Sequence, residues 1–101
     1  MTTVTTYFKK KPIRLSPYRL MRLKAQCLAR DKVCQYSNEP FGLQAHHIKF
    51  LSQGGSDVLE NLVMVSAEVH DRIHKLGTLK VSGIYPNLIW EDLSQATVKE
   101  I

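Results

Sequence analysis

The sequence has no long apolar run and only two cysteines. No stretch approaches the roughly 18 consecutive apolar residues of a membrane span, and Met1 to Phe8 lacks the basic start and apolar core of a signal peptide. Cys27 and Cys34 are too few for a disulfide framework, and thiols inside a cell stay reduced. The sequence therefore predicts a cytoplasmic protein without a membrane segment or a stabilising disulfide.

The chain is also short, with 101 residues, of which 44% are hydrophobic and 23% are charged. This length suits one domain, and this composition is typical of a folded, soluble protein. A chain of this size buries only a little over about 60% of its unfolded surface. Its core is therefore modest, and a bound metal ion would help to stabilise it.

Positive charge is concentrated near the start of the chain. Residues 1–32 contain nine lysines and arginines and a single acid, Asp31, whereas residues 33–101 contain five bases and eight acids. This asymmetry indicates a basic face that binds a polyanion, and DNA or RNA is favoured over a membrane because no amphipathic apolar anchor accompanies the charges. A surface that merely keeps the protein in solution is the other interpretation.

An arm and a helix are expected to carry this charge. Residues 1–15 are polar, basic and interrupted by Pro12, which predicts an extended arm that is flexible before it binds. Ser16 and Pro17 are typical of a helix start, and the helix is expected to run to about Arg30, with its arginines on one face. The side chains expected to contact phosphates are Lys9, Lys10, Lys11, Arg14, Arg19, Arg22 and Arg30.

The middle of the chain predicts a strand, a glycine-centred loop, a second strand and a helix. The expected ranges are 43–50 for the first strand, 53–57 for the loop, 61–65 for the second strand and 67–76 for the helix. Ser66 can cap this helix and Gly77 can end it. Beyond Gly77 the signals are weaker, with a possible strand at 79–81, a turn at 85–87 and a packing anchor at 88–90. The order indicates an α+β fold, with one domain over residues 16–101.

All four histidines fall within the segment 46–74. His70 and His74 are four residues apart on the predicted helix and can present two imidazoles to one metal ion, although such a pair alone is more often two partly exposed polar residues on a surface helix. His46 and His47 point to opposite faces of a strand, so only one of them can easily join the ion. If His46 is the third ligand, the metal site stays open to water and substrate, as a catalytic metal requires. His47 is then free to take a proton from water.

The segment LQAHHIKFLSQGGSDVLENLVMVSAEVHDRIH, residues 43–74, resembles the HNH endonuclease family. The marks of the family are a His-Ile pair at a strand end, a Gly-Gly loop, an Asn-Leu pair and a histidine that opens the helix. They correspond here to His47 and Ile48, Gly54 and Gly55, Asn61 and Leu62, and His70. The lead-in LARDKVCQYSNEPFG also looks like the family, so the resemblance covers residues from about 20 to 75.

The resemblance implies a ββα-metal core at about 43–76 and a role for each matching residue. His47 is expected to be the general base that activates the attacking water, and Asn61 is expected to hold the loop that orients it. His46, His70 and His74 are expected to bind one divalent ion, in an arrangement similar to that of the nuclease colicins. Mn²⁺ or Mg²⁺ is favoured for activity, and Zn²⁺ or Ni²⁺ is possible.

The sequence also departs from the family. Many members have an acid where this chain has His46, so the site is less negative and more tolerant of softer metals. Many members also hold a structural zinc between two pairs of cysteines. Here Ser37 follows Cys34 at the expected spacing, and Ser66 and Val69 stand at the other pair, so that second zinc site is expected to be absent.

Two functions follow from these residues. The first is a metal-dependent DNA endonuclease that hydrolyses phosphodiester bonds in duplex DNA and, as a monomer with one active site, nicks one strand. A dimer, a larger nuclease complex and a toxin neutralised by an inhibitor protein stay open as variants of this function. The second is a noncatalytic, zinc-stabilised nucleic-acid-binding module with a closed site of Cys34, His46, His70 and His74.

Overall fold

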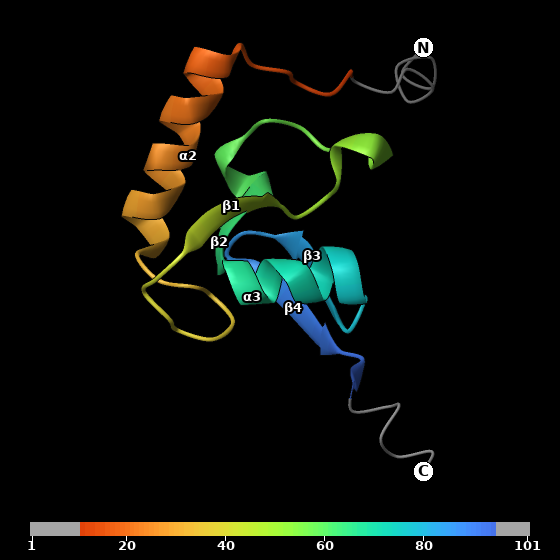
Figure 1. Cartoon of the computed structure of the whole chain (residues 1–101). Helices are drawn as coiled ribbons and strands as arrows, with labels where there is room; N and C mark the ends of the chain where they lie inside the picture. Colours follow the sequence, from red (N-terminus) through yellow and green to blue (C-terminus); the bar gives the residue numbers. More distant parts are fainter. Residues whose placement is uncertain (1–10, 95–101) are drawn as a thin grey trace.

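The computed structural model describes residues 11–94, which form an α+β fold, as the sequence predicted. Within these residues, two helices and two antiparallel hairpins alternate (Figure 1). The elements are α2 (Pro17–Asp31), β1 (Leu43–His47), the 3₁₀ turns η1 (Leu51–Gln53) and η2 (Leu59–Asn61), β2 (Leu62–Ser66), α3 (Ala67–Asp71), the π-helical turn η3 (Arg72–Leu76), β3 (Leu79–Ile84) and β4 (Asn87–Asp92). Lys9 and Lys10 lie outside the described residues.

Helix α2 begins and ends with the caps that its sequence predicts. The Ser16 side chain accepts a hydrogen bond from the backbone N–H of Arg19, and Pro17 occupies the first helical position. This pair satisfies a free amide and presets the first turn. At the other end Lys32 has a positive φ of 66°, and its N–H donates to the carbonyl of Leu28. The expected end at about Arg30 is thus correct to within one residue.

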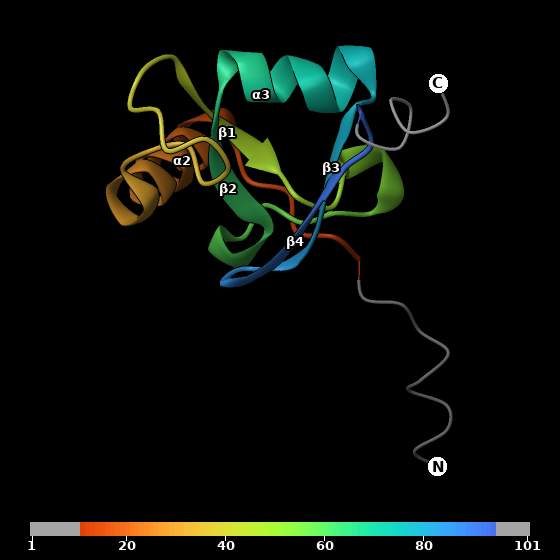
Figure 2. The same cartoon turned by 90° about the horizontal axis from the view of Figure 1, so that it is seen from below.

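The first hairpin forms the centre of the fold. Strand β1 pairs antiparallel with β2, and His46 and His47 lie opposite Val63 and Leu62. Every residue of β2 is buried. Because alternate side chains point to opposite faces, Leu62 packs in one cluster with Cys27 of α2, and Val63 packs in another with residues of α3 and the second hairpin. Figures 1 and 2 show β1 and β2 between α2 and the β3–β4 hairpin.

The second hairpin extends beyond the weak signals of its sequence. Strand β3 pairs with β4 over six residues each, whereas the sequence predicted only a strand at 79–81 and an anchor at 88–90. Trp90 is indeed an anchor, because its ring lies 5.1 Å from that of Tyr36. The Tyr36 hydroxyl and Arg72 both donate to the carboxylate of Asp92. These contacts fix the hairpin next to η3, the turn that carries His74.

The inner end of the basic arm is held in place. The Ile13 N–H donates to Ser56 Oγ at 2.9 Å, the Asp57 N–H donates to the Ile13 carbonyl at 2.8 Å, and the Leu15 N–H donates to Asp57 Oδ2 at 2.9 Å. Arg14 adds side-chain hydrogen bonds to the carbonyls of residues 51 and 55. Residues 13–15 at the inner end of the arm are therefore hydrogen-bonded to the glycine loop, and the flexibility of the arm stays a prediction.

Arg30 also binds groups within the protein. Its guanidinium forms an ion pair with Asp31 at 2.7 Å, donates to the carbonyls of Leu59 and Leu62, and lies 3.5 Å from the ring centre of Tyr85. Asp31 is buried and accepts the backbone N–H of Met64. Arg30 therefore fastens α2 to the hairpin, and most of its hydrogen-bond donors are engaged within the protein. Its contact with phosphates stays a prediction.

No helix within residues 11–94 is both long enough and apolar enough to cross a membrane.

Candidate metal centre and adjoining histidine

Three histidines from three elements meet at one point. His46 lies on β1, His70 on α3 and His74 on η3, and a possible ligand atom from each lies within 4.8 Å of the other two. The structure thus brings together the three residues that the sequence proposed as metal ligands. No other group of three or more histidine, cysteine or acidic side chains with this spacing occurs in the described part of the chain.

The geometry of the His46 and His74 rings suits a shared ion. Nδ1 of His46 lies 3.2 Å from Nε2 of His74. Two nitrogens that bind one tetrahedral ion at about 2.0–2.1 Å stand roughly 3.3 Å apart. His46 is only 2% exposed, and its Nε2 has no hydrogen-bond partner within residues 11–94. A buried imidazole that its protein neighbours leave incompletely bonded is more readily explained as a ligand than as a packing residue.

The electrostatics of the cluster favour neutral rings. Burial, together with the smaller effect of the nearby imidazoles of His74, His70 and His47, lowers the pKa of His46 to about 3. Burial also lowers the pKa of His70, and His74 adds to this effect, although Asp71 opposes it. Neutral imidazole is the form that binds metal ions. The lowered pKa values of His46 and His70 therefore favour the metal-binding form of these two rings, and the spacing of all three residues fits a divalent cation.

The second half of the predicted helix 67–76 is not α-helical. Helix α3 ends at Asp71, and η3 continues as a wider π-helical turn to Gly77, whose φ of 64° ends it. The expected α-helical stacking of His70 and His74 is therefore wrong in detail, although the two rings still lie 4.3 Å apart. Isolated π-turns are frequent at functional sites. Phe50 stacks on His74 with ring centres 5.0 Å apart and supports this ring from the loop side.

Cys34 does not join the histidines. It is fully buried in the core cluster with Ile48 and Val63, and its sulfur accepts the N–H of Ser37 at 3.4 Å. The closed site of Cys34 with three histidines is therefore not assembled. Cys27 is buried as well, and burial beside Asp31 raises the pKa of its thiol to about 12. Both cysteines are thus packing residues.

His47 stands beside the cluster without belonging to it. Its side chain is 14% exposed and lines the same open depression of about 200 Å³ as His46, His70 and His74. Its Nε2 lies 2.8 Å from Oδ1 of Asp57, a buried carboxylate. Its Nδ1 makes no hydrogen bond to any residue between 11 and 94. His47 thus lies beside the three possible ligands and has one ring nitrogen without a hydrogen-bond partner among residues 11–94.

Asp57 was not predicted from the sequence as a functional residue. Burial would raise the pKa of its carboxyl, but the Leu15 N–H and His47, together with the charge of Arg14, lower the pKa below its ordinary value. The carboxylate is therefore ionised at neutral pH. Its only signal in the sequence is an acid that closes the glycine loop ten residues after His47, and no periodicity connects the two positions.

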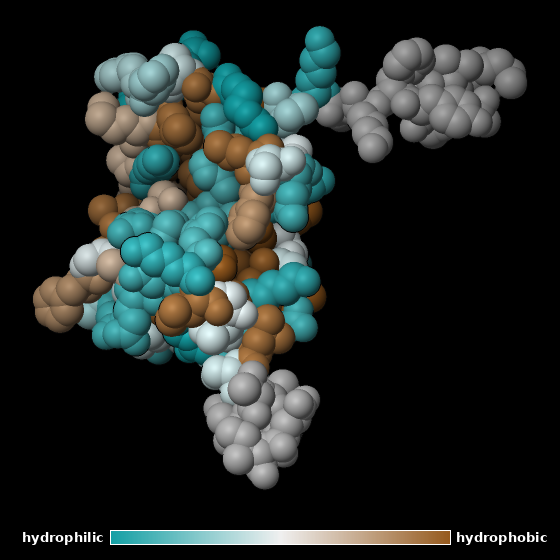
Figure 3. All heavy atoms as spheres, turned by 45° about the vertical axis from the view of Figure 1, so that its right-hand side comes forward, coloured by the Kyte–Doolittle hydropathy of each residue, from teal (hydrophilic) through white to brown (hydrophobic). Residues whose placement is uncertain are grey.

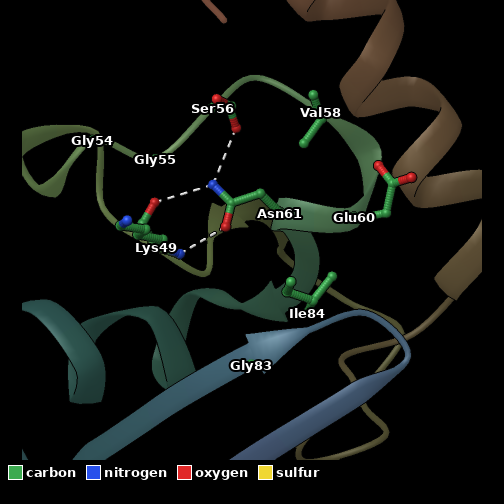
Figure 4. A pocket seen from close by; sticks show the side chains of 9 residues that line it. All are labelled: Lys49, Gly54, Gly55, Ser56, Val58, Glu60, Asn61, Gly83 and Ile84. Carbon is green, nitrogen blue, oxygen red and sulfur yellow. Dashed lines mark hydrogen bonds between the residues drawn. The ribbon is translucent and has the colours of Figure 1, made fainter. Parts of the chain in front are cut away.

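Asn61 holds the loop between these residues, as expected. Figure 4 shows its amide between the Lys49 backbone and Ser56. Its Oδ1 accepts the Lys49 N–H at 2.8 Å, and its Nδ2 donates to the carbonyls of Lys49 at 3.1 Å and Ser56 at 3.0 Å. Gly55 lets the chain pass close by, because a Cβ there would lie 1.9 Å from the Lys49 carbonyl oxygen. The loop thus returns across the end of β1 next to His47.

Replacing Asn61 with alanine is expected to lower the free energy of unfolding by about 1–3 kcal/mol, because one change removes three hydrogen bonds and leaves backbone groups without partners. Urea unfolding of the two proteins measures this difference. Gln44→Ala is the matched control, since Gln44 is an exposed amide on β1. An Asn61→Ala variant as stable as this control, within about 0.5 kcal/mol, contradicts the role of the amide in fixing the loop.

Within residues 11–94, the remaining basic residues of the arm and α2 that were expected to contact phosphates are exposed, and one of them also binds the glycine loop. Lys11, Arg19 and Arg22 are exposed, and the Arg22 guanidinium lies 5.9 Å from the ring centre of Tyr18. Arg14 is exposed as well but also binds the glycine loop. In the view of Figure 3, hydrophilic side chains cover much of the surface and separate apolar patches interrupt them. Exposed apolar residues include Tyr18, Met21 and Phe41.

No protein-family model, curated protein or solved structure matches the chain. The function therefore has to be inferred from the residues of the site and their geometry.

Proposed function

We propose that this protein is a metal-dependent endonuclease of the HNH type that hydrolyses phosphodiester bonds in DNA. The observation that carries the proposal is one depression lined by three converging imidazoles and a fourth, separately held histidine. In this interpretation β1, β2 and α3 with η3 are the ββα-metal core, because ligands come from the end of the first strand and from the following helix. Helix α2 precedes this core.

His46, His70 and His74 would hold the divalent ion through neutral ring nitrogens. When bound, the ion supplies positive charge that stabilises the phosphate and the leaving oxygen during cleavage. A set of three imidazoles without a carboxylate accepts Zn²⁺ and Ni²⁺ as well as Mn²⁺ or Mg²⁺. With three protein ligands the site keeps positions for water and a phosphate oxygen, which distinguishes a catalytic site from a closed structural one.

His47 would act as the general base. Its Nδ1 takes a proton from water, the water oxygen forms a bond to phosphorus, and the bond from phosphorus to one bridging sugar oxygen breaks. The leaving oxygen takes up a proton from solvent, and His47 then returns its proton to solvent. A neutral imidazole can perform this transfer at physiological pH. Asn61 keeps the loop in place around this step through its bonds to Lys49 and Ser56.

The exposed bases of the arm and α2 would contact DNA phosphates. Lys11, Arg19 and Arg22 have accessible side chains, and Lys9 and Lys10 precede them in the sequence. Arg14 is exposed and also donates hydrogen bonds to the glycine loop. The same side chain would therefore contact a phosphate and support the loop. These contacts would be independent of sequence, because they involve the backbone of DNA and not its bases.

Arg19→Ala and Arg22→Ala are each expected to reduce the slope of log affinity against log salt by about 0.9 on duplex DNA, because each loses one phosphate contact. Fluorescence anisotropy with a labelled duplex at several salt concentrations measures the slope. Lys80→Ala serves as a control, since Lys80 is an exposed base on β3, away from α2. An unchanged slope in both arginine variants removes α2 from the DNA-binding surface.

Supercoiled plasmid incubated with the full chain tests the function itself. The expected result is conversion to the nicked form with Mg²⁺ or Mn²⁺, and no conversion with a chelator. Because one chain has one site, the nicked form should accumulate before any linear form. Linear product without a nicked intermediate overturns action as a monomer. DNA binding without cleavage in Mg²⁺, Mn²⁺, Zn²⁺ and Ni²⁺ overturns the nuclease and favours a noncatalytic metal-stabilised module.

A further inference from the structure

The carboxylate of Asp57 bridges two groups from distant parts of the chain. Its Oδ1 contacts Nε2 of His47 at 2.8 Å, and its Oδ2 accepts the Leu15 N–H at 2.9 Å. The residue is only 5% exposed, so water does not readily replace either partner. Each oxygen therefore has an assigned donor, one from a side chain next to the metal cluster and one from the backbone before α2.

The backbone donor cannot easily turn away. Residues 13–15 lie along the glycine loop, where Ile13 exchanges hydrogen bonds with Ser56 and Asp57. Arg14 binds the carbonyls of Leu51 and Gly55 from the same segment. Helix α2 starts directly after it, capped by Ser16. The Leu15 N–H is thus fixed on both sides, and Oδ2 of residue 57 must remain an acceptor.

This arrangement also decides where the His47 ring carries its proton. An ionised carboxylate can only accept hydrogen bonds, so the Nε2 that faces Asp57 must donate. In the neutral ring, Nδ1 is then left with its lone pair. This is the nitrogen to which the proposed reaction gives the proton of water. The opposite tautomer would present an N–H to that water and could not accept its proton.

We propose that Asp57 is a positioning residue that holds His47 in the Nε2–H tautomer, and that residues 13–15 hold Asp57 in turn. The catalytic meaning of this inference rests on the proposed nuclease function, but the tautomer itself does not. Asp57 neither lines the depression nor belongs to the group of possible ligands. It acts through the orientation and protonation pattern of His47, in the way that a buried carboxylate orients the histidine of a catalytic triad.

Asp57→Asn separates this role from a structural one. The fixed Leu15 N–H selects the amide oxygen as its acceptor, so the amide NH₂ must face His47. An NH₂ group can only donate, and Nε2 must then accept, which forces the proton of the ring onto Nδ1. The variant keeps the size and the hydrogen-bond count of the wild-type side chain. It is expected to nick at least about 100-fold more slowly, because Nδ1 of His47 can then no longer accept the proton of water.

The tautomer is measured directly by ¹⁵N NMR of the histidine rings in the full chain, first with a chelator and then with Zn²⁺. The expected result is an Nε2–H ring for His47 in the wild type and an Nδ1–H ring in Asp57→Asn. Glu91→Gln, an acid-to-amide change at an exposed position of β4, should leave both the His47 tautomer and the nicking rate unchanged.

An Nδ1–H ring in the wild type, or an unchanged ring in a folded Asp57→Asn variant, overturns the proposal. If Asp57→Asn does not fold, the wild-type measurement still decides it. The tautomer can be read in a protein that cleaves nothing, so failure of the nuclease function and failure of the positioning role give different results. Normal nicking by a variant whose ring has switched would show that Nδ1 is not the proton acceptor.

Discussion

His47→Ala is expected to nick plasmid about 100- to 10,000-fold more slowly than the wild type, since a positioned general base contributes this range. The ring of His47 shares a depression with the three metal ligands but is held by Asp57 and not by the cluster. Its removal should therefore leave the ion in place. The rate is measured in single turnover with Mg²⁺ or Mn²⁺ in excess, and zinc affinity is measured on the same preparation.

His47→Gln provides the matched control for shape, because glutamine is polar and fills much of the space but cannot accept a proton from water. It should be as slow as His47→Ala and bind zinc like the wild type. A His47→Ala variant that retains more than one tenth of the wild-type rate contradicts the base assignment. A large loss of zinc affinity would instead place His47 among the ligands.

His70→Ala and His74→Ala are each expected to weaken zinc binding by at least about 100-fold, because changes in groups that only support a ligand already weaken binding by about 10- to 100-fold. Isothermal titration calorimetry measures the affinity. Thermal unfolding gives a second readout, since an ion present at about 100 times its dissociation constant stabilises the folded state by roughly 2.7 kcal/mol. Neither variant should gain this stabilisation at zinc concentrations that saturate the wild type.

Cys34→Ala is the control for the alternative closed site. Cys34 lies in the core with Val63 and Ile48, so the variant should lose some stability and keep its zinc affinity. If Cys34→Ala lost as much zinc affinity as His70→Ala, the result would support the alternative site in which Cys34 is a ligand. Wild-type zinc affinity in His70→Ala and in His74→Ala would show that the ion does not bind at the cluster.

Local signals were enough to predict most of the fold that holds the site. Ser16 and Ser66 each cap a helix as their positions indicated. Both central strands form near the predicted ranges, although β1 ends at His47 and not at residue 50, and β2 is shifted by one residue. The second hairpin was only partly predicted, because β4 alternates exposed and half-buried residues without a strongly apolar face. The π-turn that carries His74 was not predicted, since helical periodicity does not distinguish an α-helix from one wider turn.

The candidate site was predictable where residue type alone suggests chemistry. Four histidines in a short segment pointed to the cluster and to the separate role of His47. Asp57 was missed because its role depends on two loops that meet in space. The contacts of Arg30 within the protein were missed for a related reason: periodicity gives the helix face of a side chain but not what packs against that face, here Asp31 and Tyr85.

The most direct measurement is the nicking rate of the chelated full chain as one divalent ion is added back in steps. The rate should rise from zero and reach a plateau at one ion per chain when a tightly bound ion such as Mn²⁺ or Zn²⁺ is used. This result would show that one bound ion per chain is required for cleavage, as expected if the three-histidine cluster holds the ion beside His47. Cleavage that is undiminished in chelator, or no cleavage when an ion is bound and DNA is bound, would contradict a metal-dependent nuclease.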